Sequence, residues 1–169
     1  MNLSRRKLLK IGLLGSSTAA LAGGLTVWSW WDVPPARSYQ NLSSEEIIMV
    51  QALSRAAFPG GASIALDGGD ASLHRFFDQL LTSMTSENRS LLKLFLEALD
   101  RLPLLSKGRY FTDCSEESQR ELVESWLQSD NYLFRSAIQS VIVLLSIGYT
   151  SHPDVSVKLQ SYFACGFGQ

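Results

Sequence analysis

Residues 73–84 read Leu-His-Arg-Phe-Phe-Asp-Gln-Leu-Leu-Thr-Ser-Met. The apolar side chains of this stretch recur at offsets 0, 3, 4, 7, 8 and 11, which follows the 3.6-residue period of one helix face. His74 falls on the polar flank of that helix, where we expect a solvent-exposed side chain. The stretch therefore predicts an amphipathic helix whose apolar stripe packs against other helices.

A second helix is predicted on the N-terminal side of this stretch. Ser43 and Glu46 have the spacing of a capping box, and the helix that they begin should end near Ala57, because a proline follows at position 59. The intervening residues 60–70 are rich in glycine and predict a loop. Asp70 at the end of this loop is the expected N-cap of the 73–84 helix.

Three more helices are predicted on the C-terminal side. Thr85 or Ser86 should cap the first of them, and Pro103 should end it. Its expected inner stripe consists of Leu91, Leu92, Phe95, Ala98, Leu99 and Leu102. The next helix should begin from a cap at Asp113 or Ser115 and end near Leu127, after an irregular and partly extended segment at 104–114.

The last predicted helix runs from Asp130 to about Ile147, with Gly148 as its C-terminal cap. Residues 137–147 are almost wholly apolar, interrupted only by one glutamine and two serines. Because a helix that is apolar nearly all round is usually covered by its neighbours, we expect this helix at the centre of the bundle.

The expected fold class is therefore all-α, a compact bundle of about five helices in residues 42–155. Residues 1–31 precede it as a signal peptide or signal anchor. Residues 32–41, which contain a pair of prolines, are expected to be a short stiff linker. Residues 156–169 are expected to form a flexible tail of aromatic residues and glycines.

Charge is distributed unevenly along the chain. The 169 residues contain 15 Lys and Arg against 16 Asp and Glu, but residues 1–10 hold four of the basic side chains and no acid. The remaining residues are therefore mildly acidic, with a net charge of −5. A nucleic-acid partner is not expected, because nucleic-acid binding needs clustered Lys and Arg on the folded body.

The polarised N-terminus resembles a twin-arginine signal. Ser4-Arg5-Arg6-Lys7-Leu8-Leu9-Lys10 is followed by an uncharged stretch at 11–31 that is rich in glycine and hydroxyl side chains. The resemblance implies export of an already folded protein by the twin-arginine translocase, with Arg5 and Arg6 as the recognised residues. Two outcomes stay open, namely cleavage after Ala22 or retention of the segment as a membrane anchor.

The sequence contains no pattern that indicates catalysis. The two histidines lack Cys or His neighbours at metal-ligand spacing, and no phosphate loop or nucleophile elbow is present. Residues 67–70 are better explained as a glycine turn than as a calcium loop. We therefore expect no enzyme activity and no cofactor or metal bound by this chain itself.

Cys114 and Cys165 are the only two cysteines. In an oxidising compartment they could close a loop of about 50 residues as a disulfide, a bond worth about 3–4 kcal/mol. The alternatives are two free thiols, or a bridge from one cysteine to a partner chain.

Five short motifs, in this order and spacing, resemble the gluconate 2-dehydrogenase subunit 3 family. They are the twin-arginine start, Leu42-Ser43-Ser44-Glu45-Glu46, Ala57-Phe58-Pro59-Gly60-Gly61, Gly108-Arg109-Tyr110-Phe111 and Gly148-Tyr149-Thr150-Ser151-His152-Pro153. The resemblance implies a non-catalytic small subunit of a membrane-associated dehydrogenase. Its large partner would be an FAD-dependent oxidoreductase of the glucose-methanol-choline type, and a cytochrome c subunit can complete the complex.

The same resemblance implies that the small subunit carries its folded partner through the twin-arginine channel and stabilises it. The expected location is the periplasm or the periplasmic face of the bacterial inner membrane. The alternative is a helical binding or scaffold protein of the cell envelope that has no oxidoreductase partner.

Overall fold

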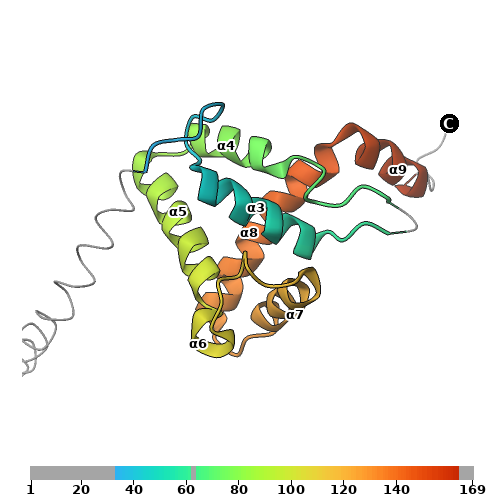
Figure 1. Cartoon of the computed structure of the whole chain (residues 1–169). Helices are drawn as coiled ribbons and strands as arrows, with labels where there is room; N and C mark the ends of the chain where they lie inside the picture. Colours follow the sequence, from blue (N-terminus) through green and yellow to red (C-terminus); the bar gives the residue numbers. More distant parts are fainter. Residues whose placement is uncertain (1–32, 62–63, 164–169) are drawn as a thin grey trace, which may run out of the picture. The chain divides into compact units, whose positions relative to one another are not determined.

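The helix from Ser44 to Ala57, α3, is the central element of the computed structural model, which describes residues 33–61 and 64–163 (Figure 1). A capping box begins this helix. The Ser43 hydroxyl accepts a hydrogen bond from the Glu46 backbone N–H at 3.3 Å, and the Glu46 carboxylate accepts one from the Ser43 N–H at 2.8 Å. The predicted cap and helix are therefore confirmed.

The amphipathic helix predicted at 73–84 is α4, Leu73–Ser83. Its buried apolar side chains are Leu73, Phe77 and Leu81, as the periodicity predicts. The predicted cap at Asp70 is wrong. Ser72 occupies the N-cap position in a left-handed conformation with φ of 54°, and the Asp70 backbone N–H donates to Asp67 Oδ1 at 2.7 Å. Residues 67–72 thus form a turn before α4 begins, and Asp70 lies inside this turn rather than at the N-cap.

The next two helices are α5, Ser86–Arg101, and the single turn α6, Leu104–Lys107. The Thr85 side chain caps α5 by accepting a hydrogen bond from the Asn88 N–H. α6 ends at Gly108, which has a φ of 66°, a left-handed conformation that glycine adopts without strain. The expected irregular, partly extended segment at 104–114 therefore begins with a helical turn.

Helix α7, Glu116–Leu127, is capped by the Ser115 side chain, which is one of the two predicted caps. Phe111, in the loop before α7, is fully buried, and its ring centroid lies 5.3 Å from that of Trp126. Because Phe111 enters the core, the loop between α6 and α7 is held against the body of the protein.

The last two helices are α8, Tyr132–Ser151, and α9, Pro153–Phe163. Gly148 does not cap α8 but lies inside it, where a Cβ atom would approach the Phe76 ring to 2.5 Å. The predicted C-cap is therefore wrong, and close packing is what requires a glycine there. α9 occupies the first part of the predicted flexible tail, and residues 164–169 lie outside the described part of the chain.

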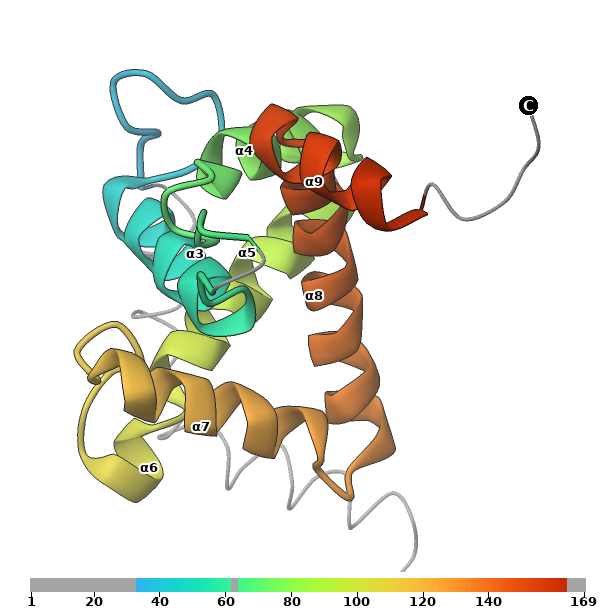
Figure 2. The same cartoon turned by 90° about the vertical axis from the view of Figure 1, so that its right-hand side faces the viewer.

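The six longer helices and the single turn α6 pack without any strand in the described residues, so the predicted all-α class is confirmed. α3 packs against α4, α5 and α7, whereas α8 packs against α4, α7 and α9 (Figures 1 and 2). The prediction of α8 as the central helix is therefore wrong. Only one side of α8 is buried, and α3 takes the central place instead.

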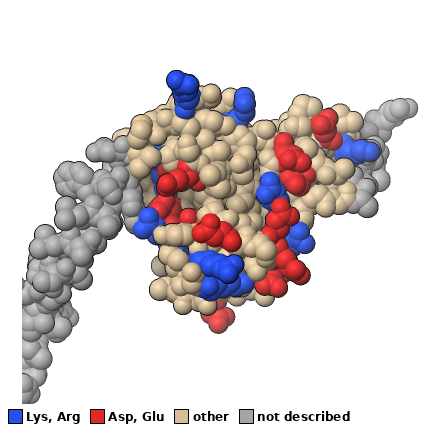
Figure 3. All heavy atoms as spheres, in the orientation of Figure 1, with Lys and Arg blue, Asp and Glu red and all other residues tan. Residues whose placement is uncertain are grey.

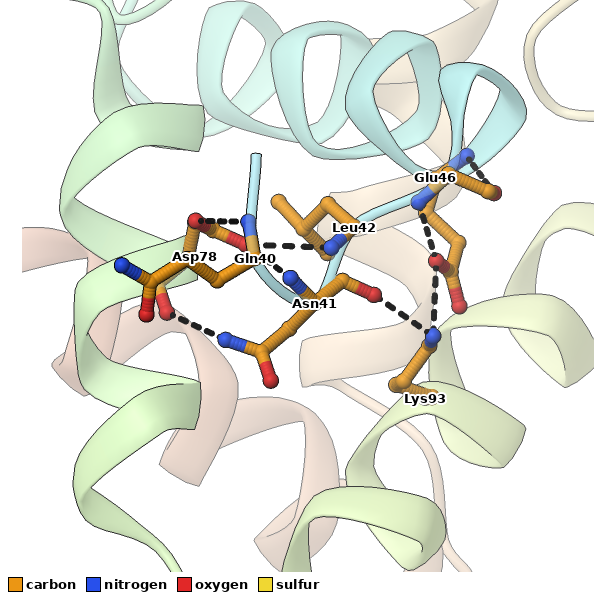
Figure 4. A network of polar contacts seen from close by, with 7 residues as sticks. Gln40, Asn41, Leu42, Glu46, Asp78 and Lys93 are labelled. Atoms are coloured by element: carbon orange, nitrogen blue, oxygen red, sulfur yellow. Dashed lines mark hydrogen bonds and ion pairs between the residues drawn. The ribbon is translucent and has the colours of Figure 1, made fainter. Parts of the chain in front are cut away.

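The segment before α3 is bound to the body rather than extended as a linker. The Asp78 carboxylate accepts hydrogen bonds from the backbone N–H groups of Gln40, Asn41 and Leu42 at 2.8–3.0 Å (Figure 4). The side-chain amide of Asn41 donates to the Asp78 backbone carbonyl at 3.1 Å. The second half of the predicted linker is thus part of the compact unit that begins at Pro35.

Candidate partner-binding surface

The two histidines lie in different parts of the structure. His74 is 8% exposed, and its ring centroid lies 5.8 Å from that of Tyr39. The expectation of a surface histidine is wrong here, because the turn at 36–41 folds over the start of α4 and covers this side chain. Burial, and secondarily the charge of Arg75, lower the pKa of His74. His152 is half-buried at the end of α8, where its Nδ1 accepts a hydrogen bond from the Asp154 N–H.

No group of three or more potential metal-binding side chains comes together within the described ranges 33–61 and 64–163. The segment at 67–70 forms a turn at which the backbone passes very close to α3. A Cβ atom on Gly68 would lie 2.1 Å from the Ser54 carbonyl oxygen. The glycine there is therefore needed for close packing of the turn against the helix.

The other residues singled out in the sequence have separate places. Cys114 is a half-buried thiol whose Sγ lies 3.3 Å from the Tyr110 carbonyl oxygen. Cys165, Arg5 and Arg6 lie outside the described residues. The disulfide between Cys114 and Cys165 and the signal role of the two arginines therefore stay predictions.

Two motifs that are distant in the sequence meet at Phe58 and Tyr149. Their rings stack with a centroid distance of 4.8 Å and an interplanar angle of 11°. The Tyr149 hydroxyl donates to the Leu66 carbonyl at 2.6 Å. Burial first, and then the negative charge of Asp67, raise the pKa of Tyr149. These motifs therefore hold the loop after α3 against α8 and contribute to the core.

The largest departure from the predicted pattern is in α5, which carries two apolar stripes. The inner stripe, formed by Leu92, Phe95, Leu96 and Leu99, packs against the core or lies within it. The outer stripe faces away from the core and consists of Leu91, Leu94, Ala98, Leu102 and, on α6, Leu105. The predicted single stripe joined members of both, so its assignment of Leu91, Ala98 and Leu102 to the inner face is wrong.

Exposure of the outer stripe is large at both ends. Leu91 is 62% exposed and Leu105 is 93% exposed, while Ala98 and Leu102 are also exposed and Leu94 is half-buried. The Leu105 N–H donates to the Leu102 carbonyl at 3.3 Å, so the stripe continues from α5 onto α6. Spacings of three and four residues place its side chains in one row along the helix. Such a row of exposed leucines is typical of a surface that a partner protein covers.

α8 has a second exposed face that contains almost no charge. Its exposed large hydrophobic side chains are Tyr132, Leu133, Val143 and Ile147, and serines, a glutamine and a threonine lie among them. In the described part of the chain, α8 is also the one helix whose length and hydropathy would suffice to cross a membrane, and 28% of its most apolar window is buried inside the protein.

Sequence reasoning found the apolar residues of both helices but not the division into covered and uncovered faces. The signal for α5 was present, because Leu91, Leu94, Ala98, Leu102 and Leu105 have helical spacing of their own.

Comparisons with protein-family models, with curated proteins and with solved structures gave no match.

Proposed function

We propose that this chain is the non-catalytic small subunit of an FAD-dependent dehydrogenase of the glucose-methanol-choline type. It escorts the folded partner through the twin-arginine translocase and stabilises it at its destination. The chain supplies no catalytic group and no cofactor of its own, and the FAD belongs to the partner. A cytochrome c subunit can complete the assembly, in the periplasm or at the periplasmic face of the inner membrane.

The observation that carries this proposal is the outer stripe of α5 and α6. Leucine side chains that stay in water on a folded domain forgo the free energy of burial, about 1.5–3 kcal/mol for each side chain that a partner would cover fully. A stably bound partner protein would cover this row of side chains and gain the free energy of their burial. The basic start with Arg5 and Arg6 adds a reason for a folded complex, because the twin-arginine pathway moves proteins that have already folded.

The test is co-purification of the tagged full chain with the flavoprotein, followed by measurement of flavin fluorescence in the eluate. We expect a complex that contains flavin, and we expect Leu91→Glu with Leu105→Glu to abolish it. Val157→Glu is the matched control, because Val157 is a similarly exposed apolar residue on a different helix. Loss of the complex in the control as well would contradict a specific role of the outer stripe.

A second measurement separates escort from mere association. Replacing Arg5 and Arg6 with lysine should leave both the chain and the flavoprotein in the cytoplasm. If the flavoprotein still reaches the periplasm, the escort role is wrong. A tagged chain that purifies without flavin under co-expression would instead support the helical scaffold protein of the cell envelope.

A further inference from the structure

A groove lies between the start of α3, the second half of α5 and the segment at 110–113. It has a volume of about 390 Å³. Its lining contains two exposed apolar side chains, Ile48 and Tyr110, above a floor that includes the buried Met49 and Leu96. The acidic side chains of the lining are Glu45, Glu46, Glu97, Asp100 and Asp113.

The wall formed by residues 110–113 is rigidly attached to α5. The Phe111 N–H donates to the Asp100 carbonyl at 2.8 Å, and the Thr112 N–H and hydroxyl both donate to Asp100 Oδ1. On its other side, the Phe111 carbonyl accepts from Gln119 Nε2 at 3.0 Å. The groove is therefore built by the fold itself and needs no ligand to hold it open.

The opposite wall is held equally firmly. Glu46 belongs to the capping box of α3, and its carboxylate also pairs with Lys93 Nζ at 3.2 Å. The same ammonium group donates to the Asn41 carbonyl at 2.7 Å, as the close-up shows (Figure 4). Movement of this wall would break the cap, so the spacing between the two walls is set by secondary structure.

The groove carries a net negative charge. Five carboxylates line it, and two of them are paired with cations, Glu97 with Arg101 and Glu46 with Lys93. Glu45 and Asp113 form no salt bridge with any residue that the structure describes. On the face shown in Figure 3, acidic side chains lie over the start of α3 and below it, with Lys and Arg side chains beside and beneath them. Two carboxylates on opposite walls are thus available to a cation from outside.

The apolar part of the groove lies between those carboxylates. Ile48 is 53% exposed and Tyr110 is 41% exposed, one on each wall. An aliphatic or aromatic side chain placed between them would bury both, and the Tyr110 ring can also receive a cation on its face. The groove therefore combines an apolar seat with negative charge on either side.

We propose that this groove binds a basic segment of the partner protein, in which an apolar side chain lies between Lys or Arg residues. Charge complementarity selects this occupant, because an acidic or neutral segment would leave Glu45 and Asp113 without a counter-charge. The groove and the outer stripe lie on neighbouring sides of α5 and its C-cap, because Glu97 and Arg101 are followed directly by Ala98 and Leu102 and successive helix residues point about 100° apart. The identity of the partner rests on the proposed function, whereas the chemistry of the occupant rests on the groove.

The first experiment uses a synthetic peptide of alternating Lys-Leu-Lys type and the full chain. We expect binding that weakens with salt, and a loss of about tenfold or more in affinity for Glu45→Lys with Asp113→Lys. Glu117→Lys with Glu124→Lys is the matched control, because these carboxylates are exposed on α7 and do not line the groove. Circular dichroism checks that both variants remain folded.

Three outcomes of this first experiment would overturn the proposal. They are equal affinity of both variants for the peptide, equal affinity of the unchanged protein for the Glu-Leu-Glu counterpart, and full competition by spermine, which has no apolar side chain. The last result would make the groove a general polycation site.

The second experiment places a photo-crosslinking amino acid at Tyr110 in the full chain within the purified complex. We expect a crosslink to a basic segment of the partner. A crosslink to residues 5–10 of this chain would overturn the proposal, because the groove would then hold the N-terminus of the same chain.

If the flavoprotein co-purifies but the charge reversal at Glu45 and Asp113 leaves the affinity of the chain for the flavoprotein unchanged, the groove proposal fails alone. If the peptide binds in the groove and no flavoprotein co-purifies, only the proposed function fails.

Discussion

Asp78 on α4 holds Asn41, the residue three positions before the start of the central helix, although the two are 37 residues apart in the sequence. Its Oδ1 atom accepts the Asn41 N–H at 2.8 Å and the Leu42 N–H at 3.0 Å, and Oδ2 accepts the Gln40 N–H at 2.9 Å. One buried carboxylate thus satisfies three successive backbone donors and ties the entry of α3 to α4.

Removal of this carboxylate should destabilise the whole helical unit. We expect Asp78→Ala to lower the free energy of unfolding by about 2–4 kcal/mol, because buried donors lose a charged acceptor. Asp78→Asn should cost less, since one oxygen remains to accept. Urea unfolding followed by circular dichroism measures both, and Gln79→Ala, a change at the neighbouring exposed residue, is the control. An equal and small effect of all three changes would contradict the anchoring role.

The two stripes of α5 should respond very differently to truncation. Leu99→Ala removes a buried side chain and should cost about 2–5 kcal/mol of unfolding free energy. Leu91→Ala should change that free energy by less than about 0.5 kcal/mol, because Leu91 is exposed in the isolated chain. A large loss at Leu91 in the absence of a partner would show that the outer stripe is covered within the chain itself.

Local signals were sufficient for much of the fold. The capping box at Ser43, the period of α4 and the cap at Ser115 could be recognised because each depends on residues within one or two helical turns. α9 could not, because among its apolar residues up to Gln160 only Val155 is buried and Leu159 partly so, too few inward positions for a detectable period.

The features that define the candidate surfaces depend on contacts between distant segments. Periodicity shows which residues share a helix face, but it does not show which face another helix covers. The outer stripe of α5 and the exposed side of α8 therefore looked like core residues. The groove joins Glu45 with Asp113, which are 68 positions apart. The buried Phe111 ring and the hydrogen bonds of Phe111 and Thr112 to Asp100 bring their segments together.

Gly148 illustrates how packing overrides helix propensity. In an exposed helix, replacement of glycine by alanine would stabilise the protein by about 1 kcal/mol. Here the new Cβ would lie 2.5 Å from Cδ1 and 2.8 Å from Cγ of Phe76, so either the Phe76 ring or the two helices must shift. We expect Gly148→Ala to destabilise by about 1–3 kcal/mol in urea unfolding. Combination with Phe76→Ala should make the alanine at 148 neutral or favourable, and strictly additive effects would contradict the contact.

His74 should make the stability of the protein depend on pH. Its Nδ1 is buried without a hydrogen-bond partner among the described residues, and burial lowers its pKa from the ordinary value of 6.5. The unfolded chain then binds the proton more readily than the folded protein does. The stability that neutral His74 contributes is therefore fully present above about pH 6.5 and is lost as the pH falls through the lower pKa of the folded state. We expect His74→Phe to flatten the decline in unfolding free energy below pH 6.5, measured by urea unfolding at a series of pH values. His152→Gln, at the half-buried second histidine, should leave that decline in place, and an unchanged pH profile in His74→Phe would assign the decline to other groups.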